Sequence, residues 1–480
     1  MRWAASYCPV IPDDGATFNE PAARTRLLQV ALIASTLWGR RVYSGRLTRA
    51  PDLDTARKRA LGAFRRGLEE SAIAPHIGTT LGRGWSLFSE HFPRRFPDFA
   101  QAFFDATGLT VEQYFTCVTG VAATYLPFDS SSGPTFAVDS VAASTAYRDV
   151  FPKYLALESQ TPKQLTVSLW KDFAKVGYRG LRERPILVLE NGRAVILDPV
   201  FYCERISVGP LFHLTARVRG DRAKSIKIFS AFGKAVEDYA SGILRRMYPD
   251  RPGLASRLRA PLEGRDRSGN TFEMDAVLND VIQIVVFEIK AAWLRDDVVL
   301  DEFETWLEEI RSRYGVAALA TEQKEVRPKG VAQLAKLSRR ILDANLGAAQ
   351  SEFAVAKIIF PVLLVHDTRL NAPVYGNFLA GEFAELLGEV PSGKRVMPLI
   401  VMTLDDLENL QSSIEGFSLC QFLADYAAAF PDGMRSLHNF MATSPAYADK
   451  LKPSEQLKES SERLLTLAHR ELFPASVRNE

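Results

Sequence analysis

The amino-acid sequence predicts a mixed α/β protein of the α+β kind, with helices toward both ends of the chain. Three observations carry this prediction. Apolar residues recur at helical spacing over much of residues 20–125. Between about residues 220 and 410, β-rich runs alternate with amphipathic segments, the order expected of a mixed central sheet flanked by helices. After residue 411 the pattern is again mainly helical.

A chain of 480 residues is long enough for two or three domains. We expect a mainly helical N-terminal domain over residues 1–184, a β-rich connecting segment over 185–224, an α/β domain over 225–410 and a helical tail over 411–480. The first boundary follows from a hairpin signal after Pro185, where two β-rich runs are joined by Asn191-Gly192. We expect the chain to stay strand-like from there to about Leu214.

Several N-terminal segments have specific helix signals. The segment "TARKRALGAFRRGLEESAI" (55–73) has apolar residues on one side and basic residues on the other. Thr110 and Gln113 have the spacing of a capping box, and "DSSSGPT" (129–135) is typical of a loop. The aromatic side chains before residue 105 recur near helical spacing, so we assign them to a hydrophobic core rather than to a base-stacking surface: Trp85, Phe88, Phe92, Phe96, Phe99, Phe103 and Phe104.

The second half of the chain carries the predicted sheet. Helices are expected at 229–249, 296–315 and 330–345, and strands at 256–263, 270–278, 281–293, 355–367 and 395–404. A last helix follows, with Thr403 as its N-cap and Asp405 and Asp406 in its first turn.

Composition excludes little but narrows the setting. Hydrophobic residues make up 47% and charged residues 24%, as in ordinary folded proteins, and a net charge of +2 neither requires nor excludes nucleic acid. Four scattered cysteines and six histidines do not predict a structural zinc site. The apolar stretch at 27–38 is too short to span a bilayer, so we expect a cytoplasmic protein without membrane contact. No Walker A or GxGxxG sequence occurs, so nucleotide-driven movement would need another subunit.

One strand places an acid and a base side by side. In "VIQIVVFEIKAAW" (281–293), Glu288 and Lys290 end an apolar run and project to the same side, whereas Ile289 points the other way. Asp275 lies on the preceding strand, and a reversal around Asn279-Asp280 permits it to come opposite the end of the second strand. Glu237, in the helix before both strands, is a further acid that could face the same point.

This set suits phosphodiester hydrolysis. Magnesium prefers hard oxygen ligands, commonly one or two carboxylates with water completing the shell. A neighbouring lysine can hold the attacking water or stabilise developing negative charge. We therefore expect Asp275 and Glu288 to bind Mg²⁺ or Mn²⁺, with Lys290 as the catalytic lysine.

The arrangement resembles the PD-(D/E)xK nuclease superfamily, which includes many restriction endonucleases and RecB-type nucleases. The resemblance covers roughly residues 225–365 and implies a restriction-endonuclease-like core: a mixed sheet flanked by helices. It assigns metal binding to Asp275 and Glu288, catalysis to Lys290, and an accessory acidic role to Glu237. Met274 stands where many members have proline. RecB-type members carry Gln-xxx-Tyr on the helix after the lysine strand, whereas Gln333 is followed at that spacing by Leu337. Gln333 stays a candidate catalytic residue, because it could still face the site.

Basic residues near this segment predict a groove for the phosphate backbone. The residues that we expect to contact nucleic acid are Arg245, Arg246, Arg257, Arg259 and Lys329. A second basic cluster lies upstream, at Arg217, Arg219, Arg222, Lys224 and Lys227. The "RPKG" loop, with Lys324 and Arg327 nearby, would extend the groove. His366-Asp367 lacks a serine or cysteine nucleophile motif, so we assign His366 to a turn at a strand end.

These features predict a Mg²⁺-dependent endonuclease that acts on DNA. By analogy we expect an effector of bacterial antiviral defence, working with other subunits of a defence system or as a homo-oligomer. Two alternatives stay open. One is a non-catalytic nucleic-acid-binding or scaffold protein with the same fold, and the other is an RNase or structure-specific nuclease, because phosphate hydrolysis demands the same residues in DNA and RNA.

Overall fold

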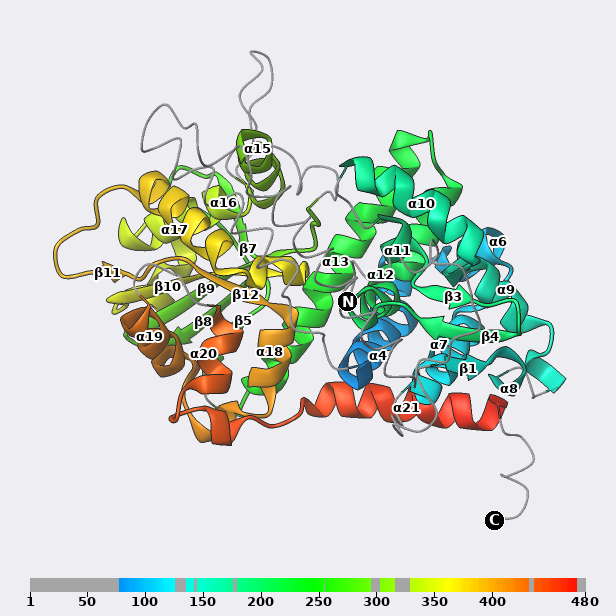
Figure 1. The fold of residues 1–480 in the computed structure, drawn as a ribbon. Helices are drawn as coiled ribbons and strands as arrows, with labels where there is room; N and C mark the ends of the chain where they lie inside the picture. The colour runs from blue at the N-terminus through cyan, green and yellow to red at the C-terminus, as the bar shows by residue number, and fades with distance from the viewer. Residues whose placement is uncertain are drawn as a thin grey trace.

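The computed structural model describes residues 77–125, 135–141, 145–175, 179–253, 255–294, 303–315, 329–430 and 436–472. Within these, the chain forms a helical half and an α/β half, with helix α13 (Arg222–Met247) between them (Figure 1). The expected helix at 55–73, the apolar stretch at 27–38, most of the loop at 129–135, Lys324 and Arg327 lie outside the described residues. Among the described helices, none has the length and hydropathy needed to cross a membrane.

The helical half confirms the predicted helix-rich N-terminal region and adds a small sheet. Its helical elements are α4 (Ile77–Ser86), η2 (Leu87–His91), α5 (Phe92–Arg95), α6 (Phe99–Thr107), α7 (Val111–Tyr125), α8 (Val138–Val141), η3 (Thr145–Tyr147), α9 (Val150–Glu158), α10 (Pro162–Lys175), α11 (Arg179–Glu183) and α12 (Pro199–Arg217). Its sheet has the order β1 (Thr135–Ala137), β4 (Arg193–Ile196), β3 (Ile186–Val188), β2 (Ser159–Gln160).

Two local signals in this half are confirmed. The Thr110 N–H donates to Gln113 Oε1 at 3.0 Å and the Gln113 N–H donates to Thr110 Oγ1 at 3.2 Å, which completes the capping box at the start of α7. Strands β3 and β4 pair antiparallel around Gly192, whose φ is 75°. Most of the predicted aromatic core is present, since Phe88, Phe92, Phe99 and Phe103 are at most 1% exposed. The assignment of Phe104 to the core is wrong, because its side chain is 48% exposed.

The expectation of strands up to Leu214 is wrong, because residues 199–217 form helix α12. The helix begins at Asp198, whose carboxylate accepts from the N–H groups of Val200 and Phe201, and Pro199 occupies the first helical position. The segment is rich in β-branched and aromatic residues, which favours a strand locally. Burial of α12 among the other helices outweighs that preference.

The α/β half is built on a mixed sheet with the order β11 (Arg395–Val396), β10 (Ile358–Val365), β9 (Gln283–Lys290), β8 (Ala276–Asp280), β5 (Leu258–Arg259). Strand β12 (Ile400–Thr403) also pairs with β10. Strands β9, β10 and β12 are parallel, and β8 is antiparallel to β9. A separate hairpin joins β6 (Leu262–Arg265) to β7 (Thr271–Met274).

The β8–β9 hairpin reverses at Val281 and Ile282, two residues later than expected. Asp280 is paired with Gln283, and Asn279 Oδ1 accepts from the Val281 N–H at 3.0 Å. The Asn279 side chain therefore closes the turn from just before it.

Helices cover both faces of this sheet. On one face lie α15 (Phe303–Tyr314), α16 (Val331–Leu342), η4 (Gly347–Phe353) and α17 (Pro373–Leu387), a helix that the sequence prediction missed. On the other lie α13, α18 (Leu404–Gln411) and α19 (Leu419–Ala429). The remaining short elements are η5 (Thr368–Asn371), after β10, and, in the C-terminal segment, η6 (Ile414–Gly416), α20 (Leu437–Thr443) and η7 (Ala448–Lys450), before the long helix α21 (Glu455–Leu472). Thr403 caps α18 as predicted, in a capping box with Asp406.

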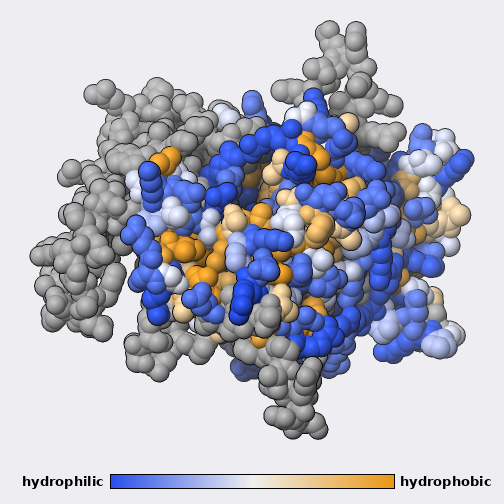
Figure 2. Space-filling model, turned by 90° about the vertical axis from the view of Figure 1, so that its right-hand side faces the viewer, coloured by the Kyte–Doolittle hydropathy of each residue, from blue (hydrophilic) through white to orange (hydrophobic). Residues whose placement is uncertain are grey.

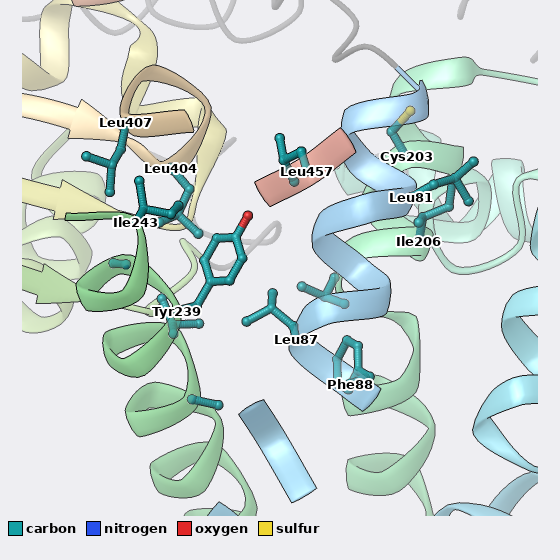
Figure 3. Packing of buried hydrophobic residues seen from close by; sticks show 14 of the residues in the cluster. Leu81, Leu87, Phe88, Cys203, Ile206, Tyr239, Ile243, Leu404, Leu407 and Leu457 are labelled. Carbon is teal, nitrogen blue, oxygen red and sulfur yellow. The ribbon is translucent and has the colours of Figure 1, made fainter. Parts of the chain in front are cut away.

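The two halves share one hydrophobic core. Helix α21 runs back along the helical half and packs on α4 and α7 (Figure 1). Figure 3 shows Tyr239 of α13 lying between Leu404 of α18 and Leu87 of η2. Viewed from the side of the helical half, the surface is mostly hydrophilic, with hydrophobic residues in patches (Figure 2).

A buried ion pair also joins the halves. Arg83 of α4 donates through Nε and Nη2 to the two carboxylate oxygens of Glu408 in α18, at 2.6 and 2.5 Å. Asp405 contacts the same guanidinium, and the Tyr239 hydroxyl donates to Glu408 Oε1 at 2.7 Å. Because Arg83 and Glu408 are each 2% exposed, the position of α18 is tied to that of α4.

Two glycines hold the end of α15 against the start of α16. A Cβ at Gly315 would lie 1.7 Å from the Lys329 carbonyl oxygen, and one at Gly330 would lie 1.9 Å from the Tyr314 carbonyl oxygen. Both residues have positive φ, 91° and 55°. The Ala332 N–H donates to the Gly315 carbonyl at 2.9 Å. Only glycine fits this contact, which fixes the N-terminus of α16.

His366 lies at a bend directly after β10, at the strand end as expected, and its side chain is buried. It is 5% exposed, and its ring packs against Trp293 and Phe232, with centroids 5.1 and 5.7 Å away. Neither ring nitrogen has a hydrogen-bond partner among the described residues. Burial lowers the pKa of His366 to about 3, and the positive charge of Arg83 adds to this shift against Asp367 and Asp405.

Replacing Gly315 by alanine is expected to lower the free energy of unfolding by about 3 kcal/mol or more, because the new Cβ meets a backbone carbonyl in a backbone region that disfavours side chains. Gly381→Ala is the matched control, since a Cβ there, within α17, meets nothing within 4 Å. It should change stability by about 1 kcal/mol or less. Urea unfolding measures both, and equal effects would contradict the account of the α15–α16 contact.

Lowering the pH from 7.5 to 5.0 is expected to destabilise the protein through His366. Its folded-state pKa is depressed, so the unfolded state binds more protons below about pH 6.5, and the free energy of unfolding falls by about 1.4 kcal/mol per pH unit between there and pH 3. In urea unfolding, the free energy of unfolding of His366→Phe should fall by about 2 kcal/mol less than that of the wild type between the two pH values. Substitution of the exposed His469 by phenylalanine is the control and should keep the pH dependence of the wild type. A His366→Phe variant with the pH dependence of the wild type would refute the prediction.

Candidate active site

Strand register brings Asp275 and Glu288 together. Ala276 is paired with Phe287, so the next step along the β8–β9 ladder sets Asp275 opposite Glu288. Side-chain alternation places both on the sheet face that α16 covers, together with Lys290. The Asp275 carboxylate accepts from the Ile289 N–H through Oδ2 at 2.7 Å. The juxtaposition predicted from the sequence is therefore present.

The bend at Asp275 explains that hydrogen bond. By the same register Ile289 faces Met274, but Met274 belongs to β7 and pairs with Leu262. The Asp275 side chain meets the Ile289 N–H where the β8 ladder ends. The bond orients the carboxylate toward the end of β9.

Glu288 is the most deeply buried member of the cluster. Its side chain is 0% exposed, and neither carboxylate oxygen makes a hydrogen bond of normal geometry with the described residues. Its contact is an ion pair between Oε1 and Lys290 Nζ. Burial raises the pKa of Glu288 to about 8, with Asp275 adding to the shift, whereas Lys290 and the Gly330 N–H oppose it. A buried carboxylate of this kind is unfavourable unless a positive charge compensates it.

Lys290 stands among acidic groups. Burial by itself would lower its pKa, but Glu288, Asp275 and Glu237 together raise it above its ordinary value. The ammonium group is therefore held in its charged form. In that form it can donate to a phosphate oxygen or to a water beside it.

Glu237, on α13, lies within electrostatic range of Asp275 and Lys290. The pKa of Glu237 is raised to about 7, mainly by burial and next by the negative charge of Asp275, whereas Lys290 lowers it. Asp275 itself has a pKa raised by burial, which Lys290 and the Ile289 N–H oppose. Three carboxyl groups thus share one lysine, so the acidic groups of the site outnumber its basic group.

This donor set fits a divalent cation. Carboxylate oxygens are the ligands that Mg²⁺ and Mn²⁺ prefer, and the buried Glu288 carboxylate has Lys290 as its charged partner. Within the described parts of the chain, no three histidine, cysteine, aspartate or glutamate side chains are grouped to hold a metal ion by themselves. Mg²⁺ commonly uses one or two carboxylates and completes its shell with water and substrate phosphate.

Sequence reasoning missed the contribution of α16. The Gly330 N–H, at the N-terminus of this helix, acts on Glu288 and lowers its pKa. The positive end of the helix dipole there favours negative charge. The two glycines at 315 and 330 were the available signal. Gln333 lies one turn further on, with Nε2 3.5 Å from the Glu273 carbonyl, so it borders the site without contacting Glu288.

Four of the five predicted nucleic-acid contacts are paired with other groups of the protein. Arg257 contacts Asp280, which is five residues from Asp275 along β8 and so about 16 Å away. Arg259 contacts Glu352, and Arg246 contacts Glu459. Arg245 donates to the Ala260 carbonyl. Lys329, beside Gly330, is exposed. Arg259 lies opposite Val277, two residues from Asp275, so these two of the five are near the candidate site.

Comparison with known proteins gives no relative from which a role could be transferred. No family model matches the chain, no curated protein matches it, and no solved structure matches it. The geometry of Asp275, Glu288, Lys290 and Glu237 is therefore the basis on which the function is inferred.

Proposed function

We propose that this protein is a metal-dependent phosphodiesterase that cuts DNA, with its active site at the end of β9. One observation carries the proposal. A fully buried glutamate, Glu288, stands opposite Asp275 and beside Lys290, and its carboxylate oxygens have no hydrogen bond of normal geometry. Proteins keep such unfavourable groups mainly where they act.

Each residue has a distinct role in this proposal. Asp275 and Glu288 would hold Mg²⁺ or Mn²⁺, which supplies Lewis-acid stabilisation of the phosphate and lowers the pKa of a bound water. Lys290 donates to the attacking water or to the phosphate oxygen on which negative charge develops. The N-terminus of α16 adds a positive dipole beside Glu288. Glu237, with its pKa near 7, can accept a proton at neutral pH.

We further propose that the α/β half is a restriction-endonuclease-like core of the PD-(D/E)xK superfamily. The order of α13, β8, β9, α15, α16 and β10 supports this, as does the position of an acid on the first helix and of Glu288 and Lys290 on one side of β9. By analogy with such nucleases the protein would act in the cytoplasm, in antiviral defence. That part of the proposal rests on the resemblance alone.

Incubation of the purified protein with Mg²⁺ or Mn²⁺ and plasmid, linear duplex, single-stranded DNA or RNA should give cleavage of DNA. Glu288→Gln and Lys290→Ala should each reduce the rate at least a hundredfold, because each removes a group that acts on the transition state. The matched controls are Glu112→Gln and Lys153→Ala, which change exposed residues of the same types in the helical half, on α7 and α9. Cleavage that survives Glu288→Gln would overturn the assignment of the site, and preferential cutting of RNA would identify the RNase alternative.

The scaffold alternative is separated by Asp275→Ala. In either case this change should spare or strengthen DNA binding, because it removes a negative charge from the site. In the enzyme it should also abolish cutting. If the wild type binds DNA but cuts no substrate with either metal, the protein is a non-catalytic scaffold and not an enzyme.

A further inference from the structure

The upstream basic cluster differs in its surroundings from the arginines near Asp280. It lies on the end of α12, the start of α13 and the connection between them. Arg217, Arg219 and Arg222 are exposed, and among the described residues none of them forms an ion pair. Lys224 contacts its neighbour Asp221, and Lys227 lies over the Phe96 ring. The unpaired positive charge of this region is thus concentrated on the α12–α13 hairpin.

Apolar side chains are exposed on the same hairpin. Phe212 of α12 is 39% exposed, and Ile226 and Phe229 of α13 are 58% and 41% exposed. The Phe212 ring lies 6.0 Å from that of Trp293, which follows Lys290 by three residues and is itself partly exposed. Trp293 also packs on Phe232, one helical turn from Phe229. Single exposed apolar residues are ordinary, but here they gather beside a candidate active site.

Helix geometry directs this surface toward the site. At 100° per residue, Ile226, Ser230 and Gly233 lie within about 40° of Glu237 around α13. Phe229 and Arg222 lie next to this stripe, both on the same side of it. Ile226 is about 16 Å from Glu237 along the helix axis. A Cβ at Gly233 would meet nothing within 4 Å, so the stripe is open at the turn before Glu237.

We propose that the α12–α13 hairpin is a platform for single-stranded DNA and leads an unpaired strand to the active site. The inference rests on the proposed function and names the substrate class of that site. Phe212, Phe229 and Trp293 offer faces on which bases can stack, and Arg217, Arg219 and Arg222 contact the backbone phosphates. A duplex keeps its bases stacked on one another, so it would use the arginines but not the aromatic rings.

The test measures binding with EDTA present, so that metal-dependent cutting does not interfere. Fluorescence anisotropy is recorded with a labelled 20-nucleotide single-stranded DNA, the duplex of the same sequence and the corresponding RNA. Phe212→Ala/Phe229→Ala should weaken single-strand binding at least tenfold and duplex binding less than twofold. Phe104→Ala/Leu465→Ala, which removes two exposed apolar side chains elsewhere, should leave both unchanged.

A second variant separates charge from stacking. Arg217→Gln/Arg219→Gln/Arg222→Gln should reduce the slope of log affinity against log salt for single-stranded DNA by about two, since each lost phosphate contact removes about 0.7. The phenylalanine variant should leave that slope unchanged. Circular dichroism confirms that both variants are folded.

Unchanged single-strand affinity in the phenylalanine variant would overturn the platform, as would an equal loss in the control or tighter binding of RNA than of DNA. Binding to anionic lipid vesicles that depends on the two phenylalanines, without binding to DNA, would assign the hairpin to a membrane instead. The outcome is independent of catalysis. If the protein cuts DNA but the phenylalanines do not matter, the platform fails and the nuclease stands; if binding depends on them but nothing is cut, the reverse holds.

Discussion

The burial of Glu288 at the end of β9 is the constraint on which the rest of the site depends. A carboxylate removed from water in this way is stable only where positive charge reaches it. Lys290 and the Gly330 N–H supply part of that charge. A divalent cation would neutralise the remaining negative charge, which Glu288 shares with Asp275 and Glu237. The burial that the fold imposes on Glu288 is therefore also what the proposed metal chemistry requires.

The surrounding fold holds this side chain in place from several directions. The β8–β9 register sets Asp275 opposite it, and the Ile289 N–H orients the Asp275 carboxylate. The close contact of Gly315 with the α16 segment brings the helix N-terminus to the same point. Helix α13 carries Glu237 on one turn and the exposed hairpin surface on earlier turns, so it links the candidate site to the surface from which we infer that a strand approaches.

The site could be predicted because it depends on patterns between residues that are close in the sequence. Strand alternation placed Glu288 with Lys290, and hairpin spacing placed Asp275 opposite, although the turn lies at Val281 rather than at Asn279-Asp280. Tertiary packing decided the rest. Helix α12 forms from a sequence with strand-like composition because it is buried, and α17 was overlooked. The partners of Arg257 and Arg259, at Asp280 and Glu352, lie 23 and 93 residues away, beyond what charge patterning can show.

The most direct test of the central claim is a calorimetric titration of Mn²⁺ into the wild-type protein and into a folded Asp275→Asn/Glu288→Gln variant. The account predicts a bound divalent ion in the wild type and no such binding in the variant, because both carboxylates are removed while the shape of the site is kept. Equal Mn²⁺ binding by the two proteins, or none by the wild type, would contradict the claim that these buried carboxylates form a metal site.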